Sequence, residues 1–175
     1  MAVFEQRPEE WNRLDFRLLR DQPVTLYHEQ AVLGDDLGWF EKQGYKSYRL
    51  DASSWSTADC FHDEVSRTLE FPAYYGRNLD AFNDCLSDLE VPTAGGVVLV
   101  FVGFDKVVTR LPSLAWRVLD IIARHSRQRL LFGARLLALV QSDDPDIQLN
   151  AVGATGVGWN PREWLKKDRG LKGAS

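Results

Sequence analysis

Three segments decide the fold: GGVVLVFV at residues 95–102, SLAWRVLDIIARHSR at 113–127 and RLLALV at 135–140. The first and last are near-continuous apolar runs, which are typical of strands buried on both faces of a sheet. The middle segment carries Trp116, Leu119 and Ile122 on one side of a predicted helix. Its polar side consists of Arg117, Asp120, Arg124 and Arg127. Two buried strands joined by a helix predict a parallel pair, and therefore an α/β fold.

Outward from these segments, the chain alternates predicted strands and helices. Strands are predicted at residues 23–28 and 45–50, with a helix over 30–43 between them. A helix that begins at a capping box of Ser56 and Asp59 must end before Pro72. Asn78 is predicted to cap the next helix, which runs to about residue 89. A short helix within 9–19, a strand at 149–152 and a helix over 161–167 complete the prediction, a single domain formed by residues 1–175.

The composition is that of a packed globular chain. Of its 175 residues, 45% are hydrophobic and 26% are charged, which favours a sizeable core over disorder. No apolar run approaches the roughly 20 residues that span a bilayer, and the first residues lack the pattern of a secretory signal. The two cysteines, Cys60 and Cys85, fall in predicted helices and are too few for a disulfide scaffold. We therefore expect a cytoplasmic protein with reduced, packed thiols and no membrane association.

The charges are distributed unevenly along the chain. Residues 59–90 contain eight acidic and two basic side chains, whereas residues 105–135 contain seven basic and two acidic ones. Such a molecule presents a negative and a positive surface, which can steer charged partners. The acidic part argues against nucleic-acid binding, and the basic part leaves it open.

The predicted helix after Asn78 carries a stripe of carboxylates. Asp80, Asp84 and Asp88 follow at intervals of four residues and therefore share one face, where like charges repel by a few tenths of a kcal/mol per pair. A merely solvated face is one interpretation, and a face kept for a cationic partner is the other. The preceding PAYYG at residues 72–76 favours the second, because exposed aromatic side chains are common at binding hot spots. We expect one of its two tyrosines to lie in the core.

The string YYGRNLDA at residues 74–81, followed by DCL at 84–86, resembles the binding loop and second helix of the barstar family. Members of this family are intracellular inhibitors of barnase-type ribonucleases. The similarity extends over residues 45–141, which leaves 1–44 and 142–175 as N-terminal and C-terminal extensions. The resemblance implies a mostly parallel barstar-like sheet with helices packed on it. We expect the N-terminal extension to enlarge this sheet by a strand and a helix.

The resemblance also implies a partner-binding site and a mode of action. Tyr74 would pack on the ribonuclease, with Gly76 and Asn78 at the contact. Asp80 and Asp84 would enter the phosphate-binding site of the enzyme in place of substrate phosphates, with Asp84 the costlier of the two to truncate. The full expected site is Tyr74, Gly76, Asn78, Asp80, Asn83, Asp84 and Asp88. The protein would be a non-enzymatic, immunity-type inhibitor, a monomer alone, that binds a secreted or toxin ribonuclease one to one.

The sequence departs from the family pattern at three places around this site. Asn83 stands where the family has tryptophan, and Arg77 stands where it has an acidic residue. The glutamate on a later helix falls near Ala123 and Arg124, with Asp120 a turn away. These changes alter the surface around the aspartates, so the identity of the ribonuclease stays open.

Other candidate sites carry weaker patterns. Asp143, Asp144 and Asp146 follow a predicted strand, where they favour a turn over a Mg²⁺ or Ca²⁺ site. The three histidines lie in separate elements, no catalytic signature surrounds either cysteine, and residues 153–158 lack dinucleotide spacing. We therefore expect no catalytic residue, no metal, no cofactor and no direct nucleic-acid contact. The alternative function is an RNA-associated or other protein-binding module that uses a basic helix face of Arg117, Arg124, Arg127 and Arg129.

Overall fold

The computed structural model describes residue 4 and residues 7–164. Its centre is a five-stranded sheet in the order β2-β3-β4-β1-β5, and every neighbouring pair of these strands is parallel. The strands are β1 (Val24–Tyr27), β2 (Lys46–Asp51), β3 (Val97–Val102), β4 (Leu136–Gln141) and β5 (Gly158–Trp159). The predicted α/β class with a parallel sheet is confirmed.

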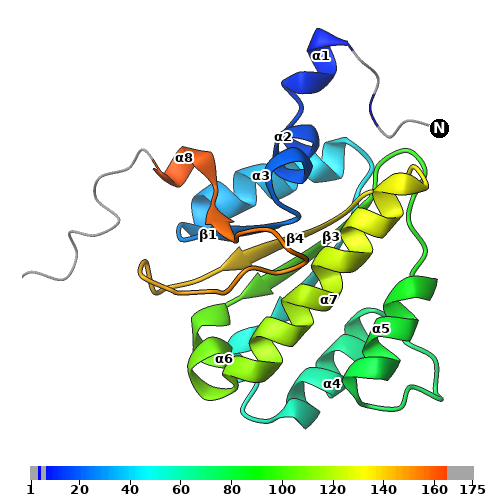
Figure 1. Ribbon diagram of the computed structural model, residues 1–175, viewed down its shortest axis with the longest axis vertical. Helices are drawn as coiled ribbons and strands as arrows, with labels where there is room; N and C mark the ends of the chain where they lie inside the picture. Colours follow the sequence, from blue (N-terminus) through cyan, green and yellow to red (C-terminus); the bar gives the residue numbers. More distant parts are fainter. Residues whose placement is uncertain (1–3, 5–6, 165–175) are drawn as a thin grey trace, which may run out of the picture.

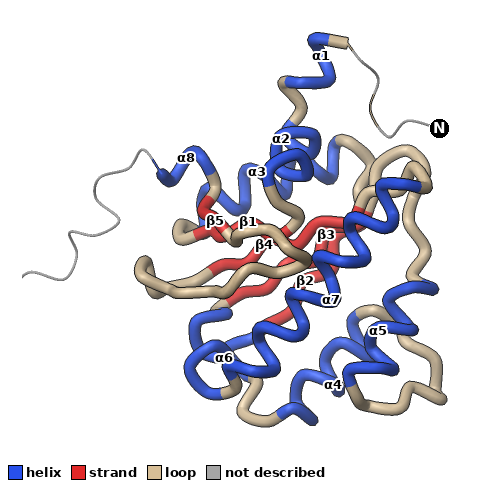
Figure 2. The backbone as a smooth tube through the Cα atoms, in the orientation of Figure 1, coloured by secondary structure: helices blue, strands red, loops and turns tan. Residues whose placement is uncertain are grey.

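Helices cover both faces of the sheet, as Figure 1 shows. One face carries α2 (Leu14–Asp21) and α3 (Gln30–Lys42), whereas four helices cover the other. These four are α4 (Ala58–Thr68), α5 (Leu79–Asp88), α6 (Phe104–Arg110) and α7 (Pro112–Leu131). Short helical segments complete the elements: α1 (Pro8–Trp11), the 3-10 turn η1 (Ala52–Ser54) and α8 (Pro161–Trp164). Figure 2 shows the sheet as the middle of three layers.

The two apolar runs of the sequence fill the middle of the sheet because both of their faces are covered. In β3, Val98 and Val100 pack toward α2 and α3, while Leu99 and Phe101 pack toward α4, α5 and α7. All six residues of β4 are buried. A strand enclosed on both sides has no solvent face to mark with polar residues, which explains the absence of alternation.

Segments outside the barstar-like region enlarge this sheet. Strand β1 pairs with β4 and β5 pairs with β1, so the predicted addition of an N-terminal strand and helix is confirmed. Polar contacts join the C-terminal segment to β1 and α3. Asp36 accepts hydrogen bonds from Tyr27 at 2.7 Å and from Asn160 at 2.8 Å, and Arg162 pairs with it at 2.5 Å. Glu163 accepts the backbone N–H groups of residues 28 and 29 at the start of α3.

The helix predicted within residues 9–19 is present but divided, because the structure has two helices there. Helix α1 ends at Trp11 and α2 begins at Leu14. Between them, Arg13 has an extended backbone with ψ of 140°. Its guanidinium donates to Asp15 at 2.9 and 3.0 Å, which holds this side chain at the start of α2.

The remaining differences concern the ends of elements and one missed helix. Thr57, not Ser56, caps α4, and its hydroxyl oxygen accepts the N–H of Cys60. The strand predicted at 149–152 is wrong: only Val152 forms a bridge there, with Thr155, and the fifth strand lies at Gly158–Trp159. Helix α6 was not predicted. Of the helix predicted over 161–167, Pro161–Trp164 is present and the rest lies outside the described residues.

Among the residues that the structure describes, none of the helices combines the length and the apolar character needed to cross a membrane.

Candidate functional site

Helix α5 begins at the asparagine that the sequence marks as its cap. The Asn78 side-chain oxygen accepts the N–H of Ala81 at 2.8 Å, and its amide nitrogen donates to the carbonyl oxygen of Gly76 at 3.2 Å. A Cβ atom on Gly76 would lie 3.2 Å from that amide nitrogen, so the glycine allows the loop to approach its own cap. Gly76 and Asn78 therefore fix the loop to the helix.

The aspartate stripe lies on the solvent side of α5. Phe82, Cys85 and Leu86 point into the core, whereas Asp80, Asp84 and Asp88 are all exposed. Within the described chain, none of the three aspartates has an ion-pair partner. Because the four-residue spacing places them on one face, these like charges repel one another.

The two tyrosines of the loop before α5 take opposite roles. Tyr75 is buried, and its hydroxyl oxygen forms a hydrogen bond with Nδ1 of His62 at 2.5 Å. Burial raises the pKa of Tyr75 and lowers the pKa of His62. Tyr74 is 82% exposed. One tyrosine thus anchors the loop to α4, and the other is presented to solvent beside the aspartates.

Arg77 does not oppose the aspartate stripe. Its guanidinium turns back to α4, where it pairs with Asp63 and, at 3.5 Å, with Asp59. The hydrogen bond from Arg77 lowers the pKa of Asp63. The backbone of Arg77 has φ of 52°, in the left-handed region that is costly for a residue with a side chain. The positive charge of Arg77 therefore offsets part of the negative charge of α4 and forms no ion pair with the described aspartates of α5.

Asn83 is joined to α7 rather than standing free on α5. Its side-chain oxygen lies 3.0 Å from Nε2 of His125, which is buried. Burial, followed by the charge of Arg129, lowers the pKa of His125, so a neutral ring that donates through Nε2 satisfies the contact. The pair is a polar link between the two helices at the position where the family has tryptophan.

Arg129 holds the C-terminal end of α5, a role that the sequence did not reveal. Its Nη2 atom lies 2.7 to 3.0 Å from the carbonyl oxygens of Leu86, Ser87 and Leu89. A cation at this end also interacts favourably with the helix dipole. Burial lowers the pKa of Arg129, and the nearby charge of Asp88 opposes that shift. No local pattern links residues that lie about 40 positions apart in the sequence.

The predicted basic face of α7 is smaller than the sequence suggests. Arg129 is partly buried against α5, and Arg124 pairs with Asp120 at 2.6 Å. Asp120, expected on the exposed polar side, is buried and accepts the N–H of Gly153 at 2.8 Å. Two of the four arginines in that face are therefore engaged within the protein, which weakens the RNA-binding alternative.

The other polar clusters have structural partners. Asp144 accepts the N–H of Asp146 at 2.9 Å, as in a turn, and Asp143 accepts the side-chain amide of Gln141. In the described part of the chain, no group of three or more histidine, cysteine or acidic side chains is arranged to hold a metal ion. Cys60 and Cys85 are both free thiols.

Comparison with known proteins identifies a family and a relative of this chain. Residues 45–139, from the start of β2 into β4, match the family model described as "Barstar (barnase inhibitor)". A protein of Bacillus subtilis (strain 168), named "Putative ribonuclease inhibitor YrdF", is 38% identical over 74 residues. That match covers 42% of this chain and 77% of the Bacillus protein. The region that matches the family model contains α4, α5 and the loop that presents Tyr74.

Proposed function

This chain belongs to the barstar family, and on that premise we propose that it is a proteinaceous inhibitor of a ribonuclease. The inhibitor covers the active site of the enzyme with the exposed face of α5 and the loop that carries Tyr74. It contributes no catalytic group of its own.

The observation that carries the proposal is the set of exposed carboxylates without internal ion-pair partners in the described structure. A ribonuclease active site holds cations arranged for phosphate oxygens, and carboxylate oxygens satisfy the same donors. Asp80 and Asp84 lie one helical turn apart, so one partner can engage both. The charge repulsion along α5 is relieved when those cations arrive.

The surroundings of the stripe suit a surface that binds without rearranging. Asn78 fixes one end of α5, Arg129 fixes the other, and the Tyr75–His62 hydrogen bond holds the loop. Tyr74 supplies an aromatic side chain at the edge, which is typical of an interface anchor. A preformed surface loses little conformational freedom on binding.

The finer form of the proposal is an immunity-type role. A one-to-one complex in the cytoplasm would protect the producing cell from its own secreted or toxin ribonuclease. Opposite charges on the two proteins would steer their encounter, so the association rate constant should fall as salt is added.

The test is an RNA-cleavage assay with a panel of small basic ribonucleases that includes barnase. Wild-type protein should abolish cleavage by at least one member at one molar equivalent. The double variant Asp80→Ala/Asp84→Ala should lose that inhibition. The matched control is Glu41→Gln, which removes an exposed charge from α3 on the other face of the sheet and should inhibit as wild type does.

Two results would contradict the proposal. If the double variant inhibits as strongly as wild type, the α5 face is not the site. If wild type inhibits no ribonuclease and instead retains RNA through Arg124 and Arg127, the basic-face alternative is supported.

A further inference from the structure

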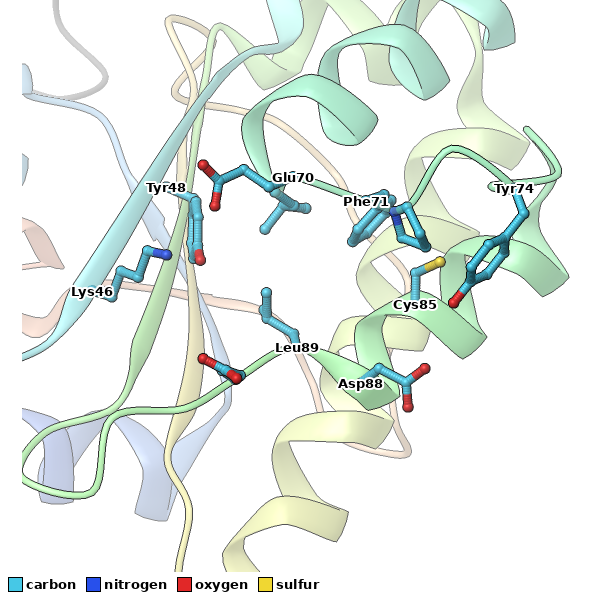
Figure 3. A pocket seen from close by; sticks show the side chains of 11 residues that line it. Lys46, Tyr48, Glu70, Phe71, Tyr74, Cys85, Asp88 and Leu89 are labelled. Carbon is cyan, nitrogen blue, oxygen red and sulfur yellow. The ribbon is translucent and has the colours of Figure 1, made fainter.

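A groove of about 370 Å³ adjoins the proposed inhibitory face. It lies between the edge strand β2, the loop after α4 and the C-terminal end of α5. Figure 3 shows Tyr48 and Glu70 on one side of it and Tyr74 and Asp88 on the other. Because Tyr74 and Asp88 also belong to the proposed inhibitory face, a partner that covers that face reaches the mouth of the groove.

The lining of the groove combines aromatic rings with carboxylates. Tyr48, Phe71 and Tyr74 supply the rings. Glu70, Asp88 and Glu90 supply three exposed carboxylates, and in the described structure none of the three forms an ion pair. Rings that offer a face to a cation, with carboxylates beside them, are the surroundings that a guanidinium group prefers.

The protein's own lysine shows that this groove stabilises a positive charge. The Lys46 ammonium nitrogen lies 4.8 Å from the centre of the Tyr48 ring. Tyr48, and to a smaller extent the charges of Glu70 and Glu90, raise the pKa of Lys46. Lys46 occupies only the β2 side of the groove, so the side formed by Tyr74 and Asp88 keeps its negative charge.

Glu70 is placed in the groove by a strained backbone. It follows α4 with φ of 56°, and the N–H of Phe71 donates to Ser66 at 2.9 Å to close the helix. Glycine or asparagine is the usual residue at this left-handed position. A glutamate there costs stability, yet it adds a carboxylate to the rim.

We propose that this groove receives an arginine side chain of the ribonuclease partner. The guanidinium plane packs against the aromatic lining between Phe71 and Tyr74, and its N–H groups pair with the rim carboxylates. The inference rests on the proposed function, because continuity with the inhibitory face identifies the occupant as part of that partner. The proposal extends the contact beyond α5. It requires that the ribonuclease carry an arginine beside its active site.

The test separates the groove from the inhibitory face. N-acetylarginine amide is titrated into the full-length protein, and backbone amide shifts are followed by NMR. Shifts should centre on Tyr48, Phe71 and Leu89, and the uncharged citrulline analogue should bind at least tenfold more weakly. The variant Glu70→Asn/Glu90→Gln should weaken arginine binding at least tenfold, while Asp80→Ala/Asp84→Ala should change it less than twofold. Asparagine is chosen because it tolerates the left-handed backbone, and thermal unfolding checks that the variant folds.

The outcomes distinguish the two proposals. The groove assignment is overturned if arginine binding is lost in Asp80→Ala/Asp84→Ala, or if it is unchanged in Glu70→Asn/Glu90→Gln. This holds even if the ribonuclease assay is positive. Arginine binding in the groove with no ribonuclease inhibited supports the groove and contradicts the proposed function.

Discussion

At the scale of single residues, side chains of one type serve different purposes within a few positions. Tyr75 packs the loop against His62, whereas Tyr74 is exposed to solvent, where we propose that it contacts the partner. Among the aspartates, Asp63 is paired with Arg77, whereas Asp84 has no ion-pair partner in the described residues. The environment of each side chain therefore decides whether it contributes to folding or to binding.

Truncating Asp84 should be the costliest single change in the inhibitory face. Removing one member of a desolvated charge pair leaves the cation of the enzyme without a partner, which costs about 2 kcal/mol or more. Asp84→Ala should therefore raise the inhibition constant by roughly 30-fold or more, and by more than Asp80→Ala. The measurement is the inhibition constant against a ribonuclease that wild type inhibits. A larger effect of Asp80→Ala would contradict this ranking.

The buried histidines should make the protein less stable in mild acid. Burial lowers the pKa values of His62 and His125 in the folded state, so the unfolded chain binds protons first as the pH falls. The free energy of unfolding should hold above the unfolded histidine pKa of about 6.5 and decrease as the pH drops below it. Urea midpoints between pH 8 and pH 5.5 measure this. The double variant His62→Gln/His125→Gln should flatten the dependence, and a wild-type midpoint that stays constant would exclude it.

At the scale of elements, α5 is a short helix held at both ends and along its inner face. Its start was readable from sequence because Asn78 precedes an apolar rhythm of the right period. The exposure of the aspartates was readable from their four-residue spacing. The contact that holds the C-terminal end of α5 could not be predicted, because Arg129 belongs to α7, about 40 residues later in the sequence.

Replacing Arg129 should loosen α5 without removing any expected contact residue. Arg129→Met keeps the apolar stem but removes the guanidinium hydrogen bonds to three carbonyl oxygens, at a cost of about 1–3 kcal/mol in stability. Arg127→Met, at an exposed position of the same helix, is the matched control. Chemical unfolding should separate the two variants. Equal stabilities would mean that water replaces Arg129 without loss.

The elements that sequence reasoning missed have weak local signals. Helix α6 has seven residues, follows a left-handed Gly103 and stops just before Pro112, so it reads as a loop. Strand β5 has two residues, too few for any period. The break between α1 and α2 lies at Arg13, whose side chain contacts Asp15, and no proline or glycine marks it in the sequence. By contrast, β3 and β4 were readable because complete burial leaves a continuous apolar run.

At the scale of the whole molecule, the proposed function assigns binding to one face of the sheet only. The proposed binding surface lies on the face covered by α4 to α7. The contacts of Asp36 and Glu163, which join the C-terminal segment to β1 and α3, lie away from that surface. Stability and inhibition should therefore be separable by mutation.

Glu163→Ala should destabilise the protein and leave inhibition intact. Two partly buried N–H groups just before α3 would lose a charged acceptor, at about 1–3 kcal/mol. This loss lowers Tm by about 2–4 °C per kcal/mol for a chain of this size. Glu41→Ala on the exposed side of α3 is the control. Calorimetry gives Tm, and the cleavage assay at a temperature well below Tm should show an unchanged inhibition constant. Weakened inhibition there would show that the two faces are coupled.

The position of β1 in the sheet also has a consequence for how the protein is made. Strand β1 is synthesised early, but its neighbour β4 follows more than a hundred residues later. At roughly 10 residues per second, a ribosome needs on the order of 10 s to produce β4 after β1. During that interval the nascent chain contains no β4 with which β1 can pair. The nascent chain should therefore depend on chaperones until β4 emerges from the ribosome.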